Sequence, residues 1–240
     1  MATYDILAPH YDAVTGDCAA EAALIQTIVD GRCPQARTVL DVACGTGAIT
    51  AALCREFEVA GLDIAPGMLA AAREKLPTGV PLHLADMASF DLGVRFDAIV
   101  CAYQGVNHLL SFPAWESFFA CAARHLNPGG VLVFDIATAG HLATMAGSGK
   151  IVQEFGGNYV VLTVCTTGAA SFEWHIEVFE LQPDRSYRLL TQTIQMSSFP
   201  VARIRAALDP WFGDIEILGD GDAADPDHKE RVWLVASRPS

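Results

Sequence analysis

The stretch TVLDVACGTGAIT, residues 38–50, places two glycines, Gly45 and Gly47, directly after an apolar run. Glycines in such a loop allow a tight turn and a close approach of the backbone to a ligand. The stretch lacks the lysine of a phosphate-binding G-x-x-x-x-G-K-[ST] loop. Thr50 stands where the dinucleotide fingerprint G-x-G-x-x-G has its third glycine. Three interpretations therefore remain open: a partial dinucleotide site, a site for a ligand without phosphate, and a structural turn without a ligand.

Short apolar runs alternate with helical patterns around this loop. The runs cover residues 38–43, 58–63, 81–85, 96–102 and 130–136. Helices are predicted over 21–30 and from near Gly47, Pro66 and Pro113. Because the runs are apolar throughout, they predict a mostly parallel sheet covered on both faces, which is a Rossmann-like doubly wound α/β fold. In such sheets ligands bind beyond the carboxyl ends of the strands.

The pattern changes after Lys150. Residues 158–167, 171–181 and 186–196 read as antiparallel strands, and within 171–181 apolar and polar side chains alternate. A helix at 201–208 and strands at 214–218 and 231–237 follow, which completes a sheet of seven strands. We therefore predict three parts: a core with its N-terminal segment (1–149), an antiparallel β insertion before the sixth strand (150–200), and the last helix and strands of the core (201–240).

Three carboxylates stand at matching places along the predicted sheet. Asp41 lies just ahead of the glycines, where it would repel a pyrophosphate and attract an ammonium group. Asp63 ends the second strand, where a carboxylate can accept both hydroxyls of a ribose. Asp86 follows the third strand, where it can accept from an adenine amino group. An ammonium, a ribose and an adenine without a phosphate describe S-adenosylmethionine.

Five motifs in order resemble those of the class I S-adenosylmethionine-dependent methyltransferases. They are VLDVACGTG, VAGLDIAPGMLAAAR, LHLADM, FDAIVC and HLNPGGVLVFD. With the N-terminal segment they cover residues 4–135, and the final strands agree in order. The resemblance favours this fold and cofactor over a dehydrogenase or a sheet without a ligand.

The N-terminal stretch YDILAPHYDAVTGD narrows the resemblance to small-molecule enzymes, such as glycine-type and amino-sugar N-methyltransferases. In those relatives the segment is a lid over the cofactor, and an antiparallel insertion precedes the sixth strand. The chain carries CAYQ at 101–104 in place of the [DN]-P-P-[YF] motif of amino-directed nucleic-acid methyltransferases. A formal net charge of −13 also argues against a nucleic-acid substrate.

The resemblance implies roles for the cofactor side of the site. Asp63 would hold the ribose, Asp86 the adenine amino group and the Met87 backbone the ring, while Ile64 and Met68 would sandwich the adenine. Tyr11 of the lid would lie near the sulfonium or bind the cofactor carboxylate. The complete predicted set of cofactor-binding residues is Tyr11, Asp41, Ala43, Gly45, Thr46, Gly47, Asp63, Ile64, Met68, Asp86, Met87 and Cys101.

The acceptor side is predicted from the segment that follows the fourth strand. His108 can titrate near neutrality and is the candidate base, although a lone histidine is more often structural. Tyr103, Gln104 and Asn107 share its loop and are predicted to orient the acceptor. Asp135 ends the fifth strand at the same rim, where it would bind substrate or cap the next helix. His175 and Glu177 are weaker candidates, because a solvated strand face explains them.

The composition limits the setting in which the protein works. Seven cysteines without a C-x-x-C pair indicate neither a disulfide framework nor a metal site, which suits a reducing cytoplasm. Neither a signal peptide nor a membrane span is expected. We expect a small-molecule acceptor, with a homodimer as the candidate assembly.

Two functions remain open at this point. The first is transfer of a methyl group to N or O of a small molecule, for example in secondary metabolism. The second is binding of S-adenosylmethionine without transfer, as in a cyclase or a regulatory protein. Both use every motif quoted above.

Overall fold

Seven strands form the central sheet of the protein, for which a computed structural model describes residues 4, 6–219 and 225–239. The strand order is β10-β11-β5-β4-β1-β2-β3. The strands are β1 (Thr38–Val42), β2 (Glu58–Asp63), β3 (Leu82–Leu84), β4 (Phe96–Cys101), β5 (Leu126–Ala137), β10 (Asp214–Gly219) and β11 (Arg231–Ser237). β11 runs antiparallel to both neighbours, and the other neighbouring strands are parallel. The predicted doubly wound, mostly parallel sheet is confirmed.

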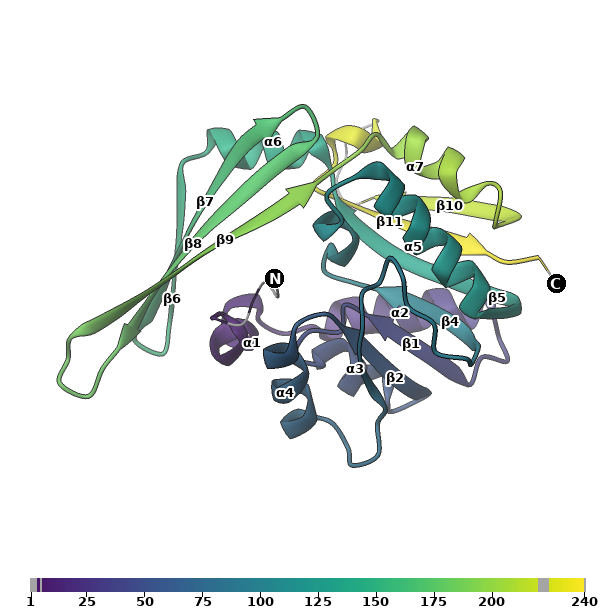
Figure 1. Cartoon of the computed structure of the whole chain (residues 1–240), viewed down its shortest axis with the longest axis horizontal. Helices are drawn as coiled ribbons and strands as arrows, with labels where there is room; N and C mark the ends of the chain where they lie inside the picture. The colour runs from purple at the N-terminus through teal and green to yellow at the C-terminus, as the bar shows by residue number, and fades with distance from the viewer. Residues whose placement is uncertain (1–3, 5, 220–224, 240) are drawn as a thin grey trace.

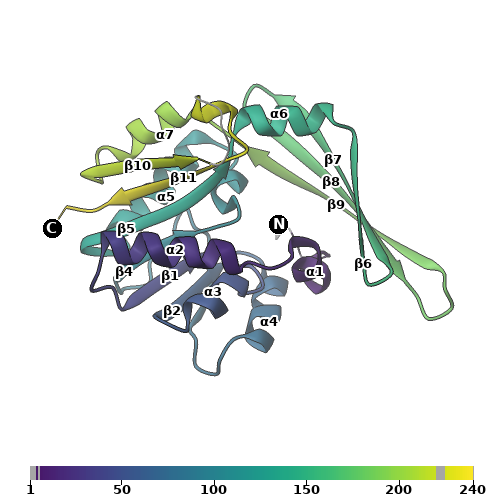
Figure 2. The same ribbon diagram turned by 180° about the vertical axis from the view of Figure 1, so that it is seen from behind.

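Helices cover both faces of this sheet. On one face lie α2 (Ala19–Arg32) and α3 (Ala48–Leu53); on the other lie α5 (Phe112–His125) and α7 (Val201–Leu208) (Figures 1 and 2). Successive side chains of a strand point to opposite faces. Ile99 of β4 therefore packs in the cluster under α5, while Val100 packs in the cluster under α2. This two-sided burial explains why the strands read as continuous apolar runs.

Most predicted elements lie within a residue or two of the observed ones, but β5 differs. The apolar run in the sequence predicts a strand that begins at Gly130. In the structure the strand begins at Leu126, immediately after α5. Its register against β4 shifts between Phe96 and Ala98, so the residues after Leu126 bulge out of the ladder.

A second sheet is inserted between β5 and β10. Its strands are β6 (Lys150–Phe155), β7 (Asn158–Gly168), β8 (Ser171–Leu181) and β9 (Tyr187–Ser197), paired antiparallel in that order. It projects away from the core in Figure 1. Helix α6 (Ala139–Gly147) leads into it. The sequence analysis predicted β7, β8 and β9 but missed α6 and β6.

The insertion joins the core at Asn107, in the 3-10 helix η2 (Gly105–His108). The Asn107 amide nitrogen donates to the carbonyls of Ala137 (3.0 Å) and Ser197 (2.7 Å), and its oxygen accepts from the Ala137 N–H (3.0 Å). Ala137 is the last residue of β5, from which the chain runs through α6 into the insertion, and Ser197 is the last residue of β9. One buried side chain therefore holds both ends of the insertion.

The N-terminal segment lies between the core and the inserted sheet (Figure 1). It forms a 3-10 turn, η1 (Ala8–His10), and a short helix, α1 (Tyr11–Thr15), with Pro9 inside the turn. Leu7 packs against apolar side chains of the inserted sheet, and Ala8 packs against Met68 of α4 (Pro66–Lys75). The segment thus contacts both parts of the molecule.

Within the described ranges no helix is long and apolar enough to span a membrane. The same residues contain no group of three or more histidine, cysteine or acidic side chains that could hold a metal ion.

Candidate cofactor and acceptor site

A cavity of about 590 Å³ opens at the carboxyl ends of β1, β2, β3 and β4. The N-terminal segment and strand β9 form its remaining walls. All of the predicted cofactor-binding residues line it except Gly47 and Cys101. The structure therefore brings together motifs that are up to about seventy-five residues apart in the sequence, from Tyr11 to Met87.

The glycine loop after β1 turns through left-handed backbone conformations. Ala43, Gly45 and Gly47 all have positive φ, of 56°, 55° and 76°. Gly45 lines the cavity, whereas a Cβ on Gly47 would lie 3.1 Å from the Leu76 side chain and 3.2 Å from Ala72. Gly47 thus serves the turn and the packing of the loop on α4, and we predict ligand contact for Gly45 only. Cys101 is completely buried behind the cavity wall.

Asp63 joins the loops that follow β1 and β2. One carboxylate oxygen accepts from the Gly45 N–H and the other from the Ala65 N–H, both at 2.8 Å. Because each carboxylate oxygen can accept more than one hydrogen bond, these contacts are compatible with the predicted binding of ribose hydroxyls.

Asp41 lies under the glycine loop and is nearly fully buried. Its carboxylate accepts from the Thr50 hydroxyl at 2.6 Å. The pKa of this carboxyl is raised to about 7, mainly by burial and to a smaller extent by the charge of Asp63, against the opposing effect of the Thr50 hydrogen bonds. A buried carboxylate of this kind gains most from an ammonium partner, which supports the role predicted for Asp41.

The predicted adenine slot has one buried wall and one open wall. Met68 is 3% exposed and Ile64 is 52% exposed. Asp86 accepts from the Ala88 N–H at 2.8 Å, which fixes the turn that carries Asp86 and Met87 to the cavity edge. Two apolar side chains beside a carboxylate and a backbone turn suit an aromatic base with an exocyclic amine.

The N-terminal segment closes the cavity over the glycine loop. Asp12 accepts from the Thr46 hydroxyl and forms an ion pair with Lys75 of α4. The rings of Tyr4 and Tyr11 meet edge to face, with centroids 5.7 Å apart, and both line the cavity. Asp12 was not among the predicted site residues, although it follows Tyr11 in the N-terminal stretch YDILAPHYDAVTGD.

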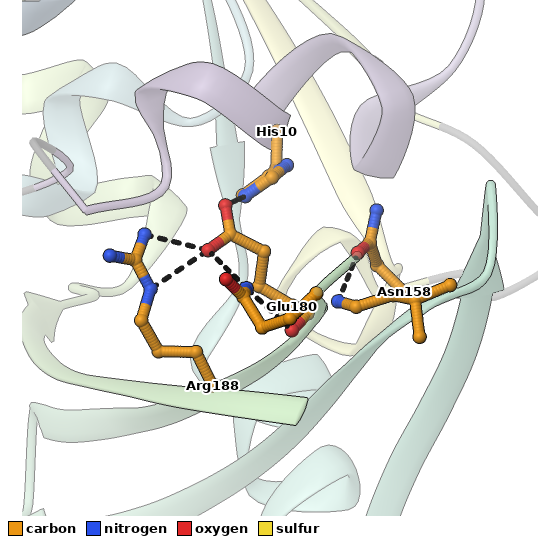
Figure 3. Close-up of polar contacts among 6 residues, drawn as sticks. His10, Asn158, Glu180 and Arg188 are labelled. Carbon is orange, nitrogen blue, oxygen red and sulfur yellow. Dashed lines mark hydrogen bonds and ion pairs between the residues drawn. The ribbon is translucent and has the colours of Figure 1, made fainter. Parts of the chain in front are cut away.

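The other side of the same segment is tied to the inserted sheet (Figure 3). His10 Nε2 lies 3.3 Å from Glu180 Oε1 on β8, and the other Glu180 oxygen pairs with Arg188 of β9 at 2.6 Å. Asn158 of β7 accepts from the Leu181 N–H at 2.8 Å, which holds the strands together at this point. The N-terminal segment thus contacts the glycine loop on one side and the inserted sheet on the other.

The loop after β4 does not present all of its predicted residues to the cavity. Tyr103 and Gln104 both have left-handed backbone, with φ of 56° and 58°. The turn is fixed by Asp135, which accepts from the Gln104 N–H at 2.9 Å and from its side-chain amide at 2.8 Å. Burial raises the pKa of Asp135 to about 6, against the effect of these bonds.

The structure places three of the predicted acceptor-side residues away from the cavity wall. Gln104, Asn107 and Asp135 are absent from the cavity wall, whereas Tyr103 and His108 line it. Asp135 and Asn107 are completely buried, and their hydrogen bonds hold the loop and the insertion. This arrangement supports positioning roles for these residues rather than direct contact with an acceptor.

His108 lies beside the N-terminal segment. Its Nε2 is 3.2 Å from the Tyr4 hydroxyl, and the two rings meet edge to face. Burial lowers the pKa of His108 to about 4, and the backbone of Gln195 opposes this only in part. The imidazole is therefore neutral near pH 7 and weakly basic. The sequence predicts a histidine that titrates near neutrality, and burial moves the pKa of His108 below that range.

Two cavity residues, Thr193 and Gln195 of β9, were not predicted. Their strand register sets them opposite His175 and Glu173 of β8. The alternation in β8 was visible in the sequence, but no feature of β9 indicated which of its residues would meet the core. His175 and Glu177, the weaker candidates, are absent from the cavity wall.

Comparison with known proteins agrees with this geometry. The methyltransferase domain family matches residues 39–130. The sugar N-methyltransferase KedS8 from Streptoalloteichus superposes with a TM-score of 0.77 at 32% identity, over 96% of this chain and 91% of that one. The chain belongs to the class I S-adenosylmethionine-dependent methyltransferases.

Two further relatives extend the comparison. The S-adenosylmethionine-bound CalS10 from Micromonospora echinaspora, an amino pentose methyltransferase, has a TM-score of 0.74 at 30% identity, over 95% of this chain and 94% of its own. The dTDP-3-amino-3,4,6-trideoxy-alpha-D-glucopyranose N,N-dimethyltransferase of Streptomyces venezuelae is 42% identical over 120 residues, which is 50% of each chain. The chain spans about half the length of the curated relatives it matches.

The cavity fits the family's cofactor, S-adenosylmethionine. It combines a nearly buried carboxylate at Asp41, an aspartate at the end of β2 and an apolar slot at Met68. These are the features needed for an ammonium, a ribose and an adenine, and they lie along one wall of one cavity.

We predict that Asp63→Ala weakens S-adenosylmethionine binding at least tenfold while the fold is retained. The substitution removes charge-assisted hydrogen bonds to the ribose, each worth roughly 1.5–3 kcal/mol, and frees the Gly45 loop. Titration calorimetry measures the effect, with circular dichroism to check the fold. Glu58→Ala, at the exposed start of the same strand, is the control. An unchanged Kd in Asp63→Ala would contradict the ribose assignment.

We predict that cofactor affinity rises with pH through about 7. Below that pH the Asp41 carboxyl is protonated in the free protein, and above it the carboxylate is present to pair with an ammonium. The increase is at most about tenfold per pH unit and levels off once Asp41 is ionised. Asp41→Asn keeps an oxygen for Thr50 but should bind weakly with a flat profile. Equal slopes in the two proteins would show that Asp41 is not the group responsible.

Proposed function

We propose that this methyltransferase transfers a methyl group from S-adenosylmethionine to the amino nitrogen of a small-molecule acceptor, an amino sugar or a similar amine. The observation that carries the proposal is the uncharged end of the cavity, where Tyr4 and His108 meet beyond the cofactor loop. The full-length similarity to a sugar N-methyltransferase and an amino pentose methyltransferase supports it. The acidic chain supports a small molecule over a nucleic acid.

An amine acceptor suits the chemistry of these side chains. Bound S-adenosylmethionine supplies an activated methyl group, and the acceptor nitrogen must present its lone pair in line with it. The neutral imidazole of His108 and the Tyr4 hydroxyl can hydrogen-bond an uncharged amine and orient that lone pair. Burial raises the pKa of Tyr4, so its hydroxyl stays protonated. Because the His108 pKa is about 4, the imidazole does not retain the proton that the methylated nitrogen loses. That proton passes to solvent.

The cover over the cavity supplies the water exclusion that methyl transfer favours. Tyr4 and Tyr11 come from the N-terminal segment, and Thr193 and Gln195 come from β9. Asp12 and His10 hold that segment between the cofactor loop and the inserted sheet. We therefore assign the insertion and the N-terminal segment jointly to enclosing the acceptor. An enclosed space beside the cofactor supports a substrate at this site and argues against a purely regulatory cofactor-binding role.

The proposal is tested by S-adenosylhomocysteine release with paired acceptors, each an amino sugar and the sugar with a hydroxyl in place of the amine. We expect turnover with at least one amine and none with its hydroxyl partner. His108→Ala should lower kcat at least tenfold and leave cofactor Kd within about twofold. His228→Ala, exposed and outside the cavity wall, is the control. Turnover of the hydroxyl partners alone would contradict N-methylation, and no release of S-adenosylhomocysteine with any amine or hydroxyl acceptor would contradict transfer as the function.

We also propose that the chain forms a homodimer through the outer part of the inserted sheet. Large apolar side chains are exposed there, among them Val152, Tyr187 and Leu189. Exposed apolar patches of this kind often mark interfaces. Light scattering should give the mass of two chains, and Val152→Glu combined with Leu189→Glu should give the mass of one. A monomeric wild-type protein at micromolar concentration would exclude the dimer.

A further inference from the structure

The charge of the cavity wall points to the class of acceptor within the proposed function. All 15 lysine and arginine residues lie in the described part of the chain, and none of them lines the cavity. The wall carries three carboxylates, Asp41, Asp63 and Asp86, along its cofactor side. Its acceptor side is made of tyrosines, His108, two leucines, Thr193 and Gln195, none of which bears a positive charge near pH 7.

Three basic side chains near the cavity are engaged with carboxylates. Lys75 pairs with Asp12, and Arg231 lies 3.1 Å from Glu21 and 3.8 Å from Asp135. On the inserted sheet Lys150 lies 3.5 Å from Glu177. Each of these basic side chains would have to leave its carboxylate partner before it could bind an anionic group of the acceptor.

The polar surface just outside the cavity is also acidic. The Gln195 side-chain amide donates to Glu173 at 3.3 Å, and Glu173 lies 3.6 Å from His175 Nε2. His175 in turn lies 3.1 Å from the Thr193 hydroxyl. Beyond the two β9 residues that line the cavity, this network therefore continues to the carboxyl group of Glu173 and contains no lysine or arginine among the described residues.

A phosphate needs what this surface lacks. Proteins bind phosphates with arginine forks, lysine ammonium groups or arrays of backbone N–H groups, because an uncompensated anion loses its hydration on burial. In a nucleotide-linked amino sugar the diphosphate is one sugar ring away from the amine. On the β9 side of the cavity such a diphosphate would find only Thr193 and Gln195, with the carboxylate of Glu173 beyond them.

Resting on the proposed N-methylation, we infer that the acceptor carries no phosphate: it is an amine whose other groups are uncharged or cationic, such as an amino-sugar glycoside, rather than a nucleotide-linked sugar. The inference separates this chain from relatives whose names specify dTDP-linked sugars, with which it shares only about half of its length. Hydroxyl groups of such an acceptor find partners in Thr193, Gln195 and Glu173. A second ammonium group on the acceptor would be attracted to Glu173.

The first arm of the test is turnover of a matched pair, a dTDP-linked amino sugar and the methyl glycoside of the same amino sugar. S-adenosylhomocysteine release gives kcat/KM for each. We expect at least a tenfold preference for the glycoside. A tenfold preference for the dTDP-linked sugar would overturn the inference and leave N-methylation standing, whereas turnover of the hydroxyl partners alone would overturn N-methylation.

The second arm needs no turnover. Calorimetry with dTDP is done on the full chain saturated with S-adenosylhomocysteine. We expect no binding by the wild-type protein at millimolar dTDP and measurable binding by Thr193→Arg and Gln195→Arg. Thr166→Arg is the control, because Thr166 is exposed and paired with Phe172, on the opposite face of the inserted sheet. Wild-type binding of dTDP below about 10 μM would overturn the inference even if neither acceptor is methylated.

Discussion

The two hydrogen bonds that the Asp63 carboxylate accepts fix the relative position of the loops that follow β1 and β2. One oxygen holds the glycine loop through Gly45 and the other holds the start of α4 through Ala65. Because α4 carries Met68 and Lys75, the same carboxylate also sets the slot beside the loop and the anchor for Asp12. Removing the Asp63 carboxylate would therefore remove the hydrogen bonds that position the glycine loop and the start of α4, on which Met68 and the Lys75–Asp12 pair depend.

The N-terminal segment contacts the glycine loop, the loop after β4 and the inserted sheet. Asp12 binds Thr46 of the loop, Tyr4 contacts His108 beyond β4, and His10 contacts Glu180 on the inserted sheet. The glycine loop, the N-terminal segment and the inserted sheet therefore lie in one contiguous series of contacts.

The sequence was informative where a residue's role depends on local pattern. Strand-end carboxylates and the glycine loop could be placed because the carboxyl ends of parallel strands meet at one edge. It was less informative for the loop after β4. Gln104 and Asn107 share a loop with His108, but two successive left-handed residues turn this loop so that only some of its side chains face the cavity. Neither Tyr103 nor Gln104 is a glycine, so nothing in the sequence marks that turn.

Thr193 and Gln195 were missed for a different reason. Period-two alternation shows which strand residues share a face, but which face meets the core depends on how the inserted sheet docks. That docking is set by Asn107 and by Leu7, which are distant from β9 in the sequence. The lowered pKa of His108 likewise follows from burial under the N-terminal segment, which no local pattern reveals.

The hydrogen bonds by which Asn107 holds Ala137 and Ser197 have an evolutionary consequence. Since the outgoing chain at Ala137 and the returning chain at Ser197 are bound by the same side chain, the ends of the inserted segment are fixed at one point of the core. Lengthening, shortening or exchanging a segment whose ends already meet costs little loop-closure entropy. Recombination between homologous genes at these two positions could therefore graft a different sheet without disturbing the cofactor loops. Such a cassette would allow new acceptors to be acquired while the methyl-donor half of the gene stays constant.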